Sequence, residues 1–169
     1  MDYQSTAAFP PIEVNGPNQA YARAMLSNLG GQNSEMTTIG SYFYDHLATI
    51  SLDKTLSDIF MRIAMVEMHH LDIFGQLARK LGADPRLWEC RQDQLVFWSP
   101  EYVHYPADVC SILRSLLSGE EEAICKYRRQ AATIDDTHVT ALLERIILDE
   151  QVHVSILKDL LHTYRPTKC

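Results

Sequence analysis

The chain has few cysteines, no long apolar run and no excess of positive charge. Its four cysteines, Cys90, Cys110, Cys125 and Cys169, include no pair separated by two residues, which excludes rubredoxin-type iron centres and zinc ribbons. Because their spacing is wide and irregular, we expect free thiols in a reducing compartment. The chain also lacks a signal-peptide pattern and any apolar stretch of membrane length, and it is therefore predicted to be cytoplasmic.

The balance of charge is acidic. A formal net charge of −7 over 169 residues argues against non-specific binding of nucleic acid and favours the attraction of cations. The length suits one domain with its own core, and an apolar share of 46% is ordinary for a globular protein. We therefore expect neither a nucleic-acid partner nor a membrane.

What the sequence does contain is a series of long amphipathic helical patterns, with no clear strand pattern. After an irregular lead-in over 1–16, these patterns cover about 18–49, 52–81, 107–132 and 136–163. The intervening segment 83–107 is too long for a tight turn and too aromatic for a disordered linker. The predicted fold is therefore all-α: one domain over 17–165, a four-helix bundle in up-down-down-up order with a long crossover between its second and third helices.

A pair of glycines, Gly30 and Gly31, interrupts the first helical pattern. Glycine is a poor helix former, so the pair can mark a kink. It can equally mark a point where another backbone segment packs closely. Both explanations stay open at this stage.

Two of the patterns contain a glutamate followed three residues later by a histidine, Glu67 with His70 and Glu150 with His153. Three residues along a helix correspond to about 300° of rotation, so both side chains leave one face, one turn apart. Each pair lies in the middle of an apolar stripe, where water should be scarce. A carboxylate and an imidazole placed in this way can bind one metal ion.

A third pair of this kind, Glu101 with His104, lies in the crossover between Pro100 and Pro106. The spacing alone is weak, because it arises readily by chance. This pair is not on a long helix and has no inward-facing glutamate beside it. We therefore interpret it as a coincidence.

Each of the other two pairs is preceded, on the helix before it, by one inward-facing glutamate. Glu35 lies in line with apolar residues of the first pattern. Glu120 is the one member of the run Glu120, Glu121 and Glu122 that falls on the apolar face of the third. The two halves of the chain thus repeat one design, at nearly equal spacing.

Two explanations compete for these residues. They are partly exposed polar groups at helix edges, or they are ligands of a two-metal site. Four carboxylates on apolar stripes favour the second, because burying unpaired ions costs several kcal/mol each and two divalent cations offset four negative charges. The predicted ligands are Glu35, Glu67, His70, Glu120, Glu150 and His153.

The ligand types narrow the choice of metal. Four carboxylates with two imidazoles suit two iron or two manganese ions, whereas structural zinc prefers thiolate-rich sites. One imidazole per metal leaves room for a small-molecule oxidant, peroxide or dioxygen. His69 points about 100° away from His70 and is not predicted to be a ligand.

Three further residues have open roles. Asp149 either accepts a hydrogen bond from a ligand histidine or is an ordinary surface residue. Tyr42 and Tyr127 each follow an inward glutamate by two turns. For both tyrosines we favour core packing over a redox role.

Four motifs resemble those of known proteins. Leu29-Gly30-Gly31-Gln32-x-x-Glu35-x-Thr37 is similar to the first ligand helix of manganese catalases, and Gly119-Glu120 to the third-helix motif of rubrerythrins. Val66-Glu67-Met68-His69-His70-Leu71 resembles the second-helix motif of both groups, and Asp149-Glu150-x-x-His153 resembles the last. Over about residues 18–163 the chain thus resembles the ferritin-like superfamily, in its rubrerythrin and manganese-catalase branches.

We expect the six ligands to divide between two ions. Glu67 and Glu150 would bridge or share the metals, Glu35 and Glu120 would cap the ends, and His70 and His153 would each hold one ion. The resemblance implies two-electron chemistry on peroxide, of the catalase or peroxidase type, and we expect a homo-oligomer that is a dimer or larger.

Some features depart from the resemblance. The chain lacks the cysteine-rich electron-transfer domain of rubrerythrins, and Ala123 stands where rubrerythrins carry an extra glutamate. Disproportionation of peroxide suits such a chain, because it requires no outside reductant. An iron-storage protein, or a structural bundle with a vestigial site, is the alternative.

Overall fold

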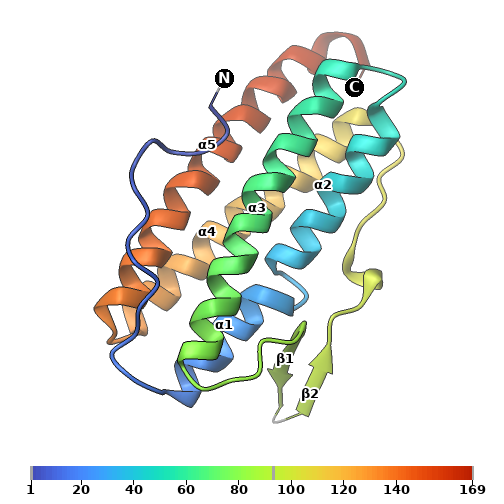
Figure 1. Ribbon diagram of the computed structural model, residues 1–169. Coiled ribbons are helices and arrows are strands. Elements are labelled where there is room, and N and C mark those ends of the chain that lie inside the picture. The colour runs from blue at the N-terminus through green and yellow to red at the C-terminus, as the bar shows by residue number, and fades with distance from the viewer. Residues whose placement is uncertain (1, 93, 169) are drawn as a thin grey trace.

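The computed structural model describes residues 2–92 and 94–168, and the side chains of 165–168 are outside that description (Figure 1). The helices are α1 (Gln19–Gly30), α2 (Glu35–Thr49), α3 (Lys54–Lys80), α4 (Val109–Thr133) and α5 (Thr137–Lys168). Figure 1 shows α2, α3, α4 and α5 side by side as a four-helix bundle, and α1, which precedes α2 in the chain, lies in line with α2 along α3. The predicted all-α bundle with a long crossover is therefore the fold of this chain.

The helices begin where a polar side chain can satisfy their first free N–H groups. Asn18 accepts hydrogen bonds from two backbone amides at the start of α1, and Ser34 accepts one at the start of α2. Asp53 and Asp108 do the same for α3 and α4. The cap at Ser34 matters most for the site, because Glu35 is the first residue of the helix that follows.

The single helix expected over 18–49 is wrong in detail, since a break over 31–34 divides it into α1 and α2. The glycine pair both interrupts the helix and allows another backbone segment to pack closely, so both explanations offered for it hold. A Cβ added at Gly30 would lie 2.7 Å from backbone atoms of Leu87 and Trp88, so the crossover packs directly on the glycine backbone. Helix α1 ends there and the chain starts a new helix at Glu35.

The crossover contains a β-hairpin that the sequence did not predict. Strands β1 (Trp88–Arg91) and β2 (Gln94–Phe97) pair antiparallel, with Trp88 opposite Phe97. Strands of four residues are too short for a visible alternation of polar and apolar residues. Beyond the hairpin, the indole of Trp98 donates a hydrogen bond to Thr37 Oγ1 at 3.0 Å, which ties the crossover to α2.

The core consists of two apolar clusters with a polar layer between them. One cluster gathers side chains such as Phe74 of α3 and Leu142 of α5, and the other gathers Phe60 of α3 and Leu157 of α5. Along both α3 and α5, the Glu-x-x-His pair lies between the residues of the two clusters. The polar layer is therefore closed off from water along the bundle axis in both directions.

The prediction of four free thiols is wrong for Cys110, which is disulfide-bonded. Cys90 and Cys125 are free, and Cys169 lies outside the described residues. The spacing in the sequence does not indicate this bond, because pairing depends on which chain segments meet in space. The predicted cytoplasmic location stays a prediction.

Asp45 of α2 is a buried carboxylate that lies away from the polar layer. It is 2% exposed, and its Oδ1 has no hydrogen-bond partner among the described residues. Burial raises its pKa to about 7. Since this value exceeds the unfolded value of about 3.9, the folded state binds more protons between these two pH values, and stability falls as pH rises through that window.

We expect Asp45→Asn to stabilise the metal-free protein at pH 8 by about 1–2 kcal/mol, because the amide has no charge to desolvate. At pH 4 both chains are neutral at this position, so the gain should nearly vanish. Thermal unfolding at the two pH values measures the difference. Asp58→Asn, at an exposed carboxylate paired with Lys54, is the control and should change little. An equal gain for Asp45→Asn at both pH values would contradict the explanation.

Candidate metal centre

All six predicted ligand side chains come together in the polar layer of the bundle. Each is at most 2% exposed. Helix α2 brings one carboxylate through its first turn, α4 brings one from its middle, and α3 and α5 each bring a carboxylate and an imidazole. The six are Glu35, Glu67, His70, Glu120, Glu150 and His153.

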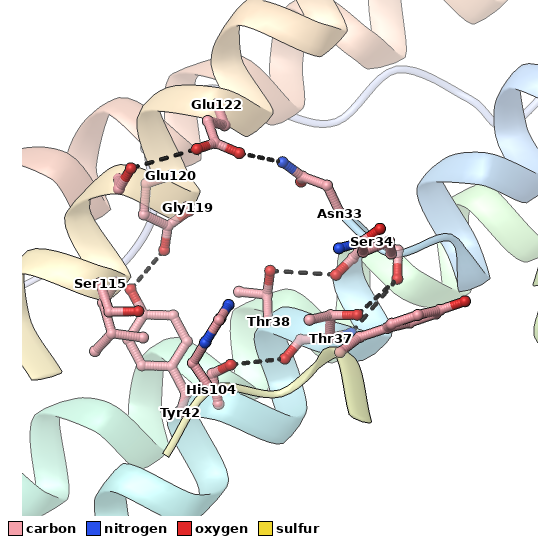
Figure 2. Close-up of a pocket in the computed structure, with 15 residues that line it drawn as sticks. Asn33, Ser34, Thr37, Thr38, Tyr42, His104, Ser115, Gly119, Glu120 and Glu122 are labelled. Atoms are coloured by element: carbon pink, nitrogen blue, oxygen red, sulfur yellow. Dashed lines mark hydrogen bonds between the residues drawn. The ribbon is translucent and has the colours of Figure 1, made fainter. Parts of the chain in front are cut away.

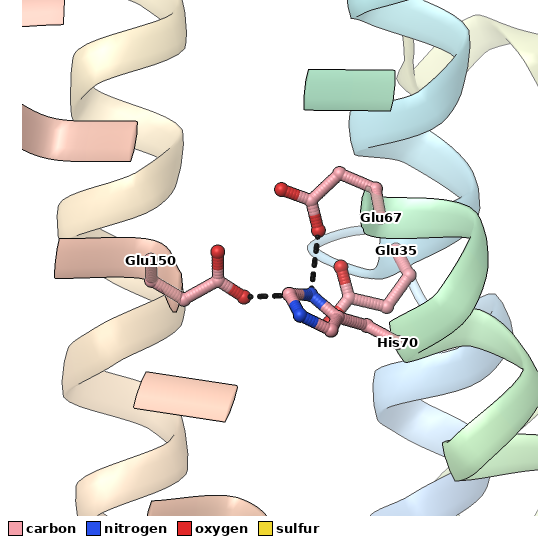
Figure 3. Close-up of side chains that lie close together, drawn as sticks. All are labelled: Glu35, Glu67, His70 and Glu150. Carbon is pink, nitrogen blue, oxygen red and sulfur yellow. Dashed lines mark hydrogen bonds and ion pairs between the residues drawn. The ribbon is translucent and has the colours of Figure 1, made fainter. Parts of the chain in front are cut away.

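The donor atoms form two overlapping groups, and within each group they lie within 4.8 Å of one another. One group, drawn in Figure 3, contains Glu35, Glu67, His70 and Glu150. The other contains Glu67, Glu120, Glu150 and His153. Glu67 and Glu150 belong to both groups, and each of the other four residues belongs to one. The geometry is therefore that of two adjacent cation positions with two shared carboxylates.

Both imidazoles turn the same ring nitrogen toward the shared carboxylates. His70 Nδ1 lies 3.0 Å from Glu67 Oε2 and 3.3 Å from Glu150 Oε1. His153 Nδ1 lies 2.9 Å from Glu67 Oε1 and 3.0 Å from Glu150 Oε2. The ring centroids are 6.3 Å apart. Each Nδ1 thus faces one of the two positions.

Two atoms of the site test whether cations fit it. Glu67 Oε1 and Glu150 Oε1 are buried and have no hydrogen-bond partner among the described residues. Glu67 Oε1 is close to His153 Nδ1, yet the two atoms do not have hydrogen-bond geometry. Buried oxygens without partners are costly, and a cation between these lone pairs would satisfy them. The donor set and its geometry fit a pair of divalent ions.

The electrostatics of the layer indicate a deficit of positive charge. Burial, with the neighbouring carboxylates of Glu67 and Glu150, raises the pKa of Glu120 to about 8 and the pKa of Glu35 well above its usual value. Burial alone would lower the pKa of His70, but the carboxylates of Glu150 and Glu67 hold it well above its usual range. Protons therefore balance the charge of the layer where cations are absent, and bound metal would displace them.

The two tyrosines do more than fill the core. The hydroxyl of Tyr42 on α2 donates to Glu120 Oε1 on α4 at 2.5 Å, and the hydroxyl of Tyr127 on α4 donates to Glu35 Oε1 on α2 at 2.5 Å. Each tyrosine thus fixes the outer carboxylate of the opposite half. Core packing, the role favoured from the sequence, is incomplete because both side chains are also hydrogen-bonded to the site.

Asp149 takes the first of its two proposed roles. It is fully buried, and its Oδ2 lies 3.1 Å from Nε2 of His70. Its Oδ1 accepts a hydrogen bond from Arg145 Nη1 at 2.7 Å. Arg145 was not predicted from the sequence, although its position four residues before Asp149 on one helix was an available signal.

Several residues predicted to lie outside the site do so. His69, Glu121 and Glu122 are exposed, and none of them belongs to either donor group. Glu101 is exposed in the short 3₁₀ helix Pro100–Tyr102 and also lies outside both groups. Its partner His104 is no ligand candidate either, but it lines a pocket that reaches the site.

That pocket opens between α2, α4 and the crossover and has a volume of about 540 Å³. Figure 2 shows Tyr42 and Glu120 along its wall, together with several side-chain hydroxyls. The hydroxyls belong to Ser34, Thr37, Thr38, Ser41, Ser115 and Ser118. Because Glu120 is one of the outer carboxylates, the pocket connects solvent with one end of the polar layer. We call it the α2–α4 pocket.

Fold and site together define a ferritin-like helical bundle with a carboxylate-rich dinuclear metal site. The structure resembles KatB, a manganese catalase from Anabaena PCC7120, with a TM-score of 0.84 and 18% identity over 98% of this chain and 81% of that chain. It also resembles the bacterioferritin of Rhodobacter capsulatus, with a TM-score of 0.73 and 22% identity over 88% of each chain. At these identities the structural likeness shows the fold alone.

Sequence comparison identifies the family. The family model for manganese-containing catalases matches residues 9–93, half of the chain. A probable manganese catalase from Clostridium acetobutylicum is 22% identical over 89% of this chain and 74% of its own length. The chain belongs to the manganese-containing catalase family. Its cofactor is accordingly a pair of manganese or iron ions. Among the described residues, no helix has the length and apolar character needed to cross a membrane.

Proposed function

We propose that this protein disproportionates hydrogen peroxide at two metal ions held in the polar layer of the bundle. Glu67 and Glu150 would bridge the ions, Glu35 and Glu120 would each bind one from the side, and His70 and His153 would each bind one through Nδ1. The observation that carries the proposal is the pair of overlapping donor groups with two shared carboxylates, in a chain of this family.

In disproportionation, one peroxide is oxidised to dioxygen with loss of two protons and two electrons, and a second takes them up to give two water molecules. The bound metal pair supplies a reversible two-electron couple. No outside reductant is consumed. The chain's own task is to hold the ions, admit peroxide and carry protons.

The α2–α4 pocket is the route we propose for peroxide. Its hydroxyl groups can both donate and accept hydrogen bonds, which matches the hydrogen-bonding pattern of peroxide itself. Tyr42 lies where the pocket meets the polar layer, and its hydroxyl donates to Glu120. We assign to Tyr42 the placement of the Glu120 carboxylate and the donation of a hydrogen bond at the inner end of the pocket.

We also propose that the chain forms a homo-oligomer. Large apolar side chains are exposed along the second half of α2 and the turn that follows it, from Phe43, which is 51% exposed, to Leu52, which is 68% exposed. Clustered apolar exposure of this kind is typical of surfaces that contact another chain.

One experiment tests the function. The protein is purified without added metal and then loaded with Mn²⁺ or Fe²⁺, and metal content, oligomer size and oxygen release from peroxide are measured on the same sample. We expect about two ions per chain, the number of sites the donor groups define, and oxygen release without an added reductant. Peroxide consumption that needs an electron donor would indicate a peroxidase, and a large cage that accumulates iron would indicate storage. Failure to bind metal would contradict the whole proposal.

A further inference from the structure

The segment that precedes α1 lies along the bundle beside the two helices that carry the Glu-x-x-His pairs. Figure 1 shows this segment running along α5. It contacts α3 as well, since the ring of Phe9 packs edge-on against His69 with centroids 4.7 Å apart. Residues 3–9, here called the N-terminal strap, therefore cover the α3–α5 side of the metal centre, opposite the α2–α4 pocket.

Backbone groups of the strap hold the outer ends of both ligand histidines, one directly and the other through Asp149. The carbonyl oxygen of Tyr3 lies 2.9 Å from Nε2 of His153. The backbone N–H of Ser5 donates to Asp149 Oδ1 at 2.7 Å, and Asp149 Oδ2 lies 3.1 Å from Nε2 of His70. One histidine is thus held by the strap directly, and the other is held through Asp149.

These contacts determine which ring nitrogen carries the proton. A carbonyl oxygen can only accept a hydrogen bond, so Nε2 of His153 must donate and must carry hydrogen. The carboxylate of Asp149 imposes the same condition on Nε2 of His70. Once a bound cation displaced the proton of Nδ1, each ring would keep its hydrogen on Nε2, and Nδ1, the nitrogen that faces the shared carboxylates, would offer its lone pair to the ion.

A buried arginine holds the strap in place. Arg145 is 5% exposed, and its guanidinium donates to the carbonyl of Ala7 at 2.7 Å, to the carbonyl of Ser5 at 3.0 Å and to Asp149. The ring of Phe9 lies 4.0 Å from the same guanidinium. Without the strap, this buried charge would lose two of its hydrogen-bond acceptors. Arg145 therefore couples the position of the strap to that of Asp149.

We propose that the N-terminal strap is a positioning element of the metal centre, which holds both ligand histidines in the tautomer that binds metal through Nδ1 and slows the release of bound metal. The proposal rests on the ligand set assigned above and adds residues that contact no metal. Because the two essential groups are a backbone carbonyl and a backbone N–H, many side chains would serve at positions 3 and 5. The sequence pattern of the strap therefore does not reveal the role.

The decisive variant is Ser5→Pro, because proline removes the backbone N–H that donates a hydrogen bond to Asp149. Ser5→Ala keeps this N–H and removes only the hydroxyl, which bonds the Ala7 amide. Ala8→Pro places a proline in the same segment, where the described hydrogen bonds do not use the backbone N–H. Ser5→Ala is the control for the loss of the serine side chain, and Ala8→Pro is the control for the stiffening of the backbone by proline.

The protein is loaded with Mn²⁺, and its loss to excess chelator is followed over time. We expect Ser5→Pro to lose metal about 10-fold faster than the natural chain, the lower end of the effect of removing the partner of a ligand histidine, because Asp149 itself remains and keeps its hydrogen bond from Arg145. Both controls should stay within about twofold of the natural chain. Arg145→Lys keeps the positive charge but cannot make all three hydrogen bonds of the guanidinium, so it should also accelerate the loss of metal.

A second readout separates positioning from simple loss of stability. In protein loaded with Co²⁺, a histidine bound through Nδ1 shows a strongly shifted proton signal from its Nε2–H, and this signal survives only where solvent exchange is slow. We expect two protected signals in the natural chain and in both controls, and loss or rapid exchange of the His70 signal in Ser5→Pro.

The outcomes distinguish the two proposals. Normal metal loading with unchanged release and unchanged N–H signals in Ser5→Pro would overturn the role of the strap and leave the metal centre intact. A lower melting temperature of metal-free Ser5→Pro, without faster metal release, would likewise reduce the strap to a structural element. Failure of the natural chain to bind Mn²⁺ or Co²⁺ would refute the ligand set, and the role of the strap with it.

Discussion

Glu67→Ala and Glu150→Ala are each expected to abolish loading of the metal pair, whereas Glu121→Ala should bind as much metal as the natural chain. Glu67 and Glu150 belong to both donor groups, so the loss of either removes a ligand from both ions at once. Glu121 lies one residue from a predicted ligand, but it points about 100° away around α4 and is exposed. Metal quantification after loading and removal of free ions measures the difference.

The same variants should also lose the stabilisation that metal provides. Ions that bind only the folded chain raise its melting temperature, because their binding free energy adds to the free energy of unfolding. We expect added Mn²⁺ to raise the melting temperature of the natural chain and of Glu121→Ala, and to leave that of Glu67→Ala unchanged. Since alanine also leaves a cavity, Glu67→Gln should be measured beside it. Equal metal loading in all these chains would show that the ligand assignment is wrong.

Gly119→Trp is expected to lower kcat/KM for peroxide by roughly tenfold or more, a loss of about 1.4 kcal/mol in transition-state stabilisation, while metal content stays unchanged. Gly119 lines the α2–α4 pocket, and a Cβ added there meets no atom within 4 Å. A large ring at this position therefore enters the pocket without displacing the helix. Initial rates of oxygen release are measured at several peroxide concentrations and divided by the amount of bound metal, which gives kcat/KM for each variant.

Gly119→Ala is the matched control. It adds one methyl group to the same pocket and should keep the activity, because most of the space remains open. It should also raise the free energy of unfolding by about 0.5–1 kcal/mol, since glycine is a poor helix former. Full activity of both variants with normal metal content would show that peroxide reaches the ions by another path.

The burial of the six candidate ligands could be predicted because it depends on local periodicity. Glu67 and His70 had to share a face of α3, and that face had to be apolar for the helix to pack, so the pair had to be buried. The same argument selected Glu120 over Glu121, and the structure places Glu120 in the layer and Glu121 on the surface. Helix faces follow from the order of residues alone.

Other features could not be predicted because they depend on contacts between distant segments. The break after Gly30 is favoured by the backbone of Leu87 and Trp88, which the chain brings there only after a long crossover. The hairpin over 88–97 was missed because its strands are too short to show an alternation.

By itself, the sequence determined the four amphipathic patterns and the six acidic and imidazole side chains on their buried faces. The tertiary structure alone decided how those side chains are held. Tyr42 reaches Glu120 from another helix, and the N-terminal strap reaches His153 over a separation of 150 residues. The physical reason is that periodicity sets which face of a helix turns inward, whereas hydrogen-bond partners across the bundle depend on where each segment is finally packed.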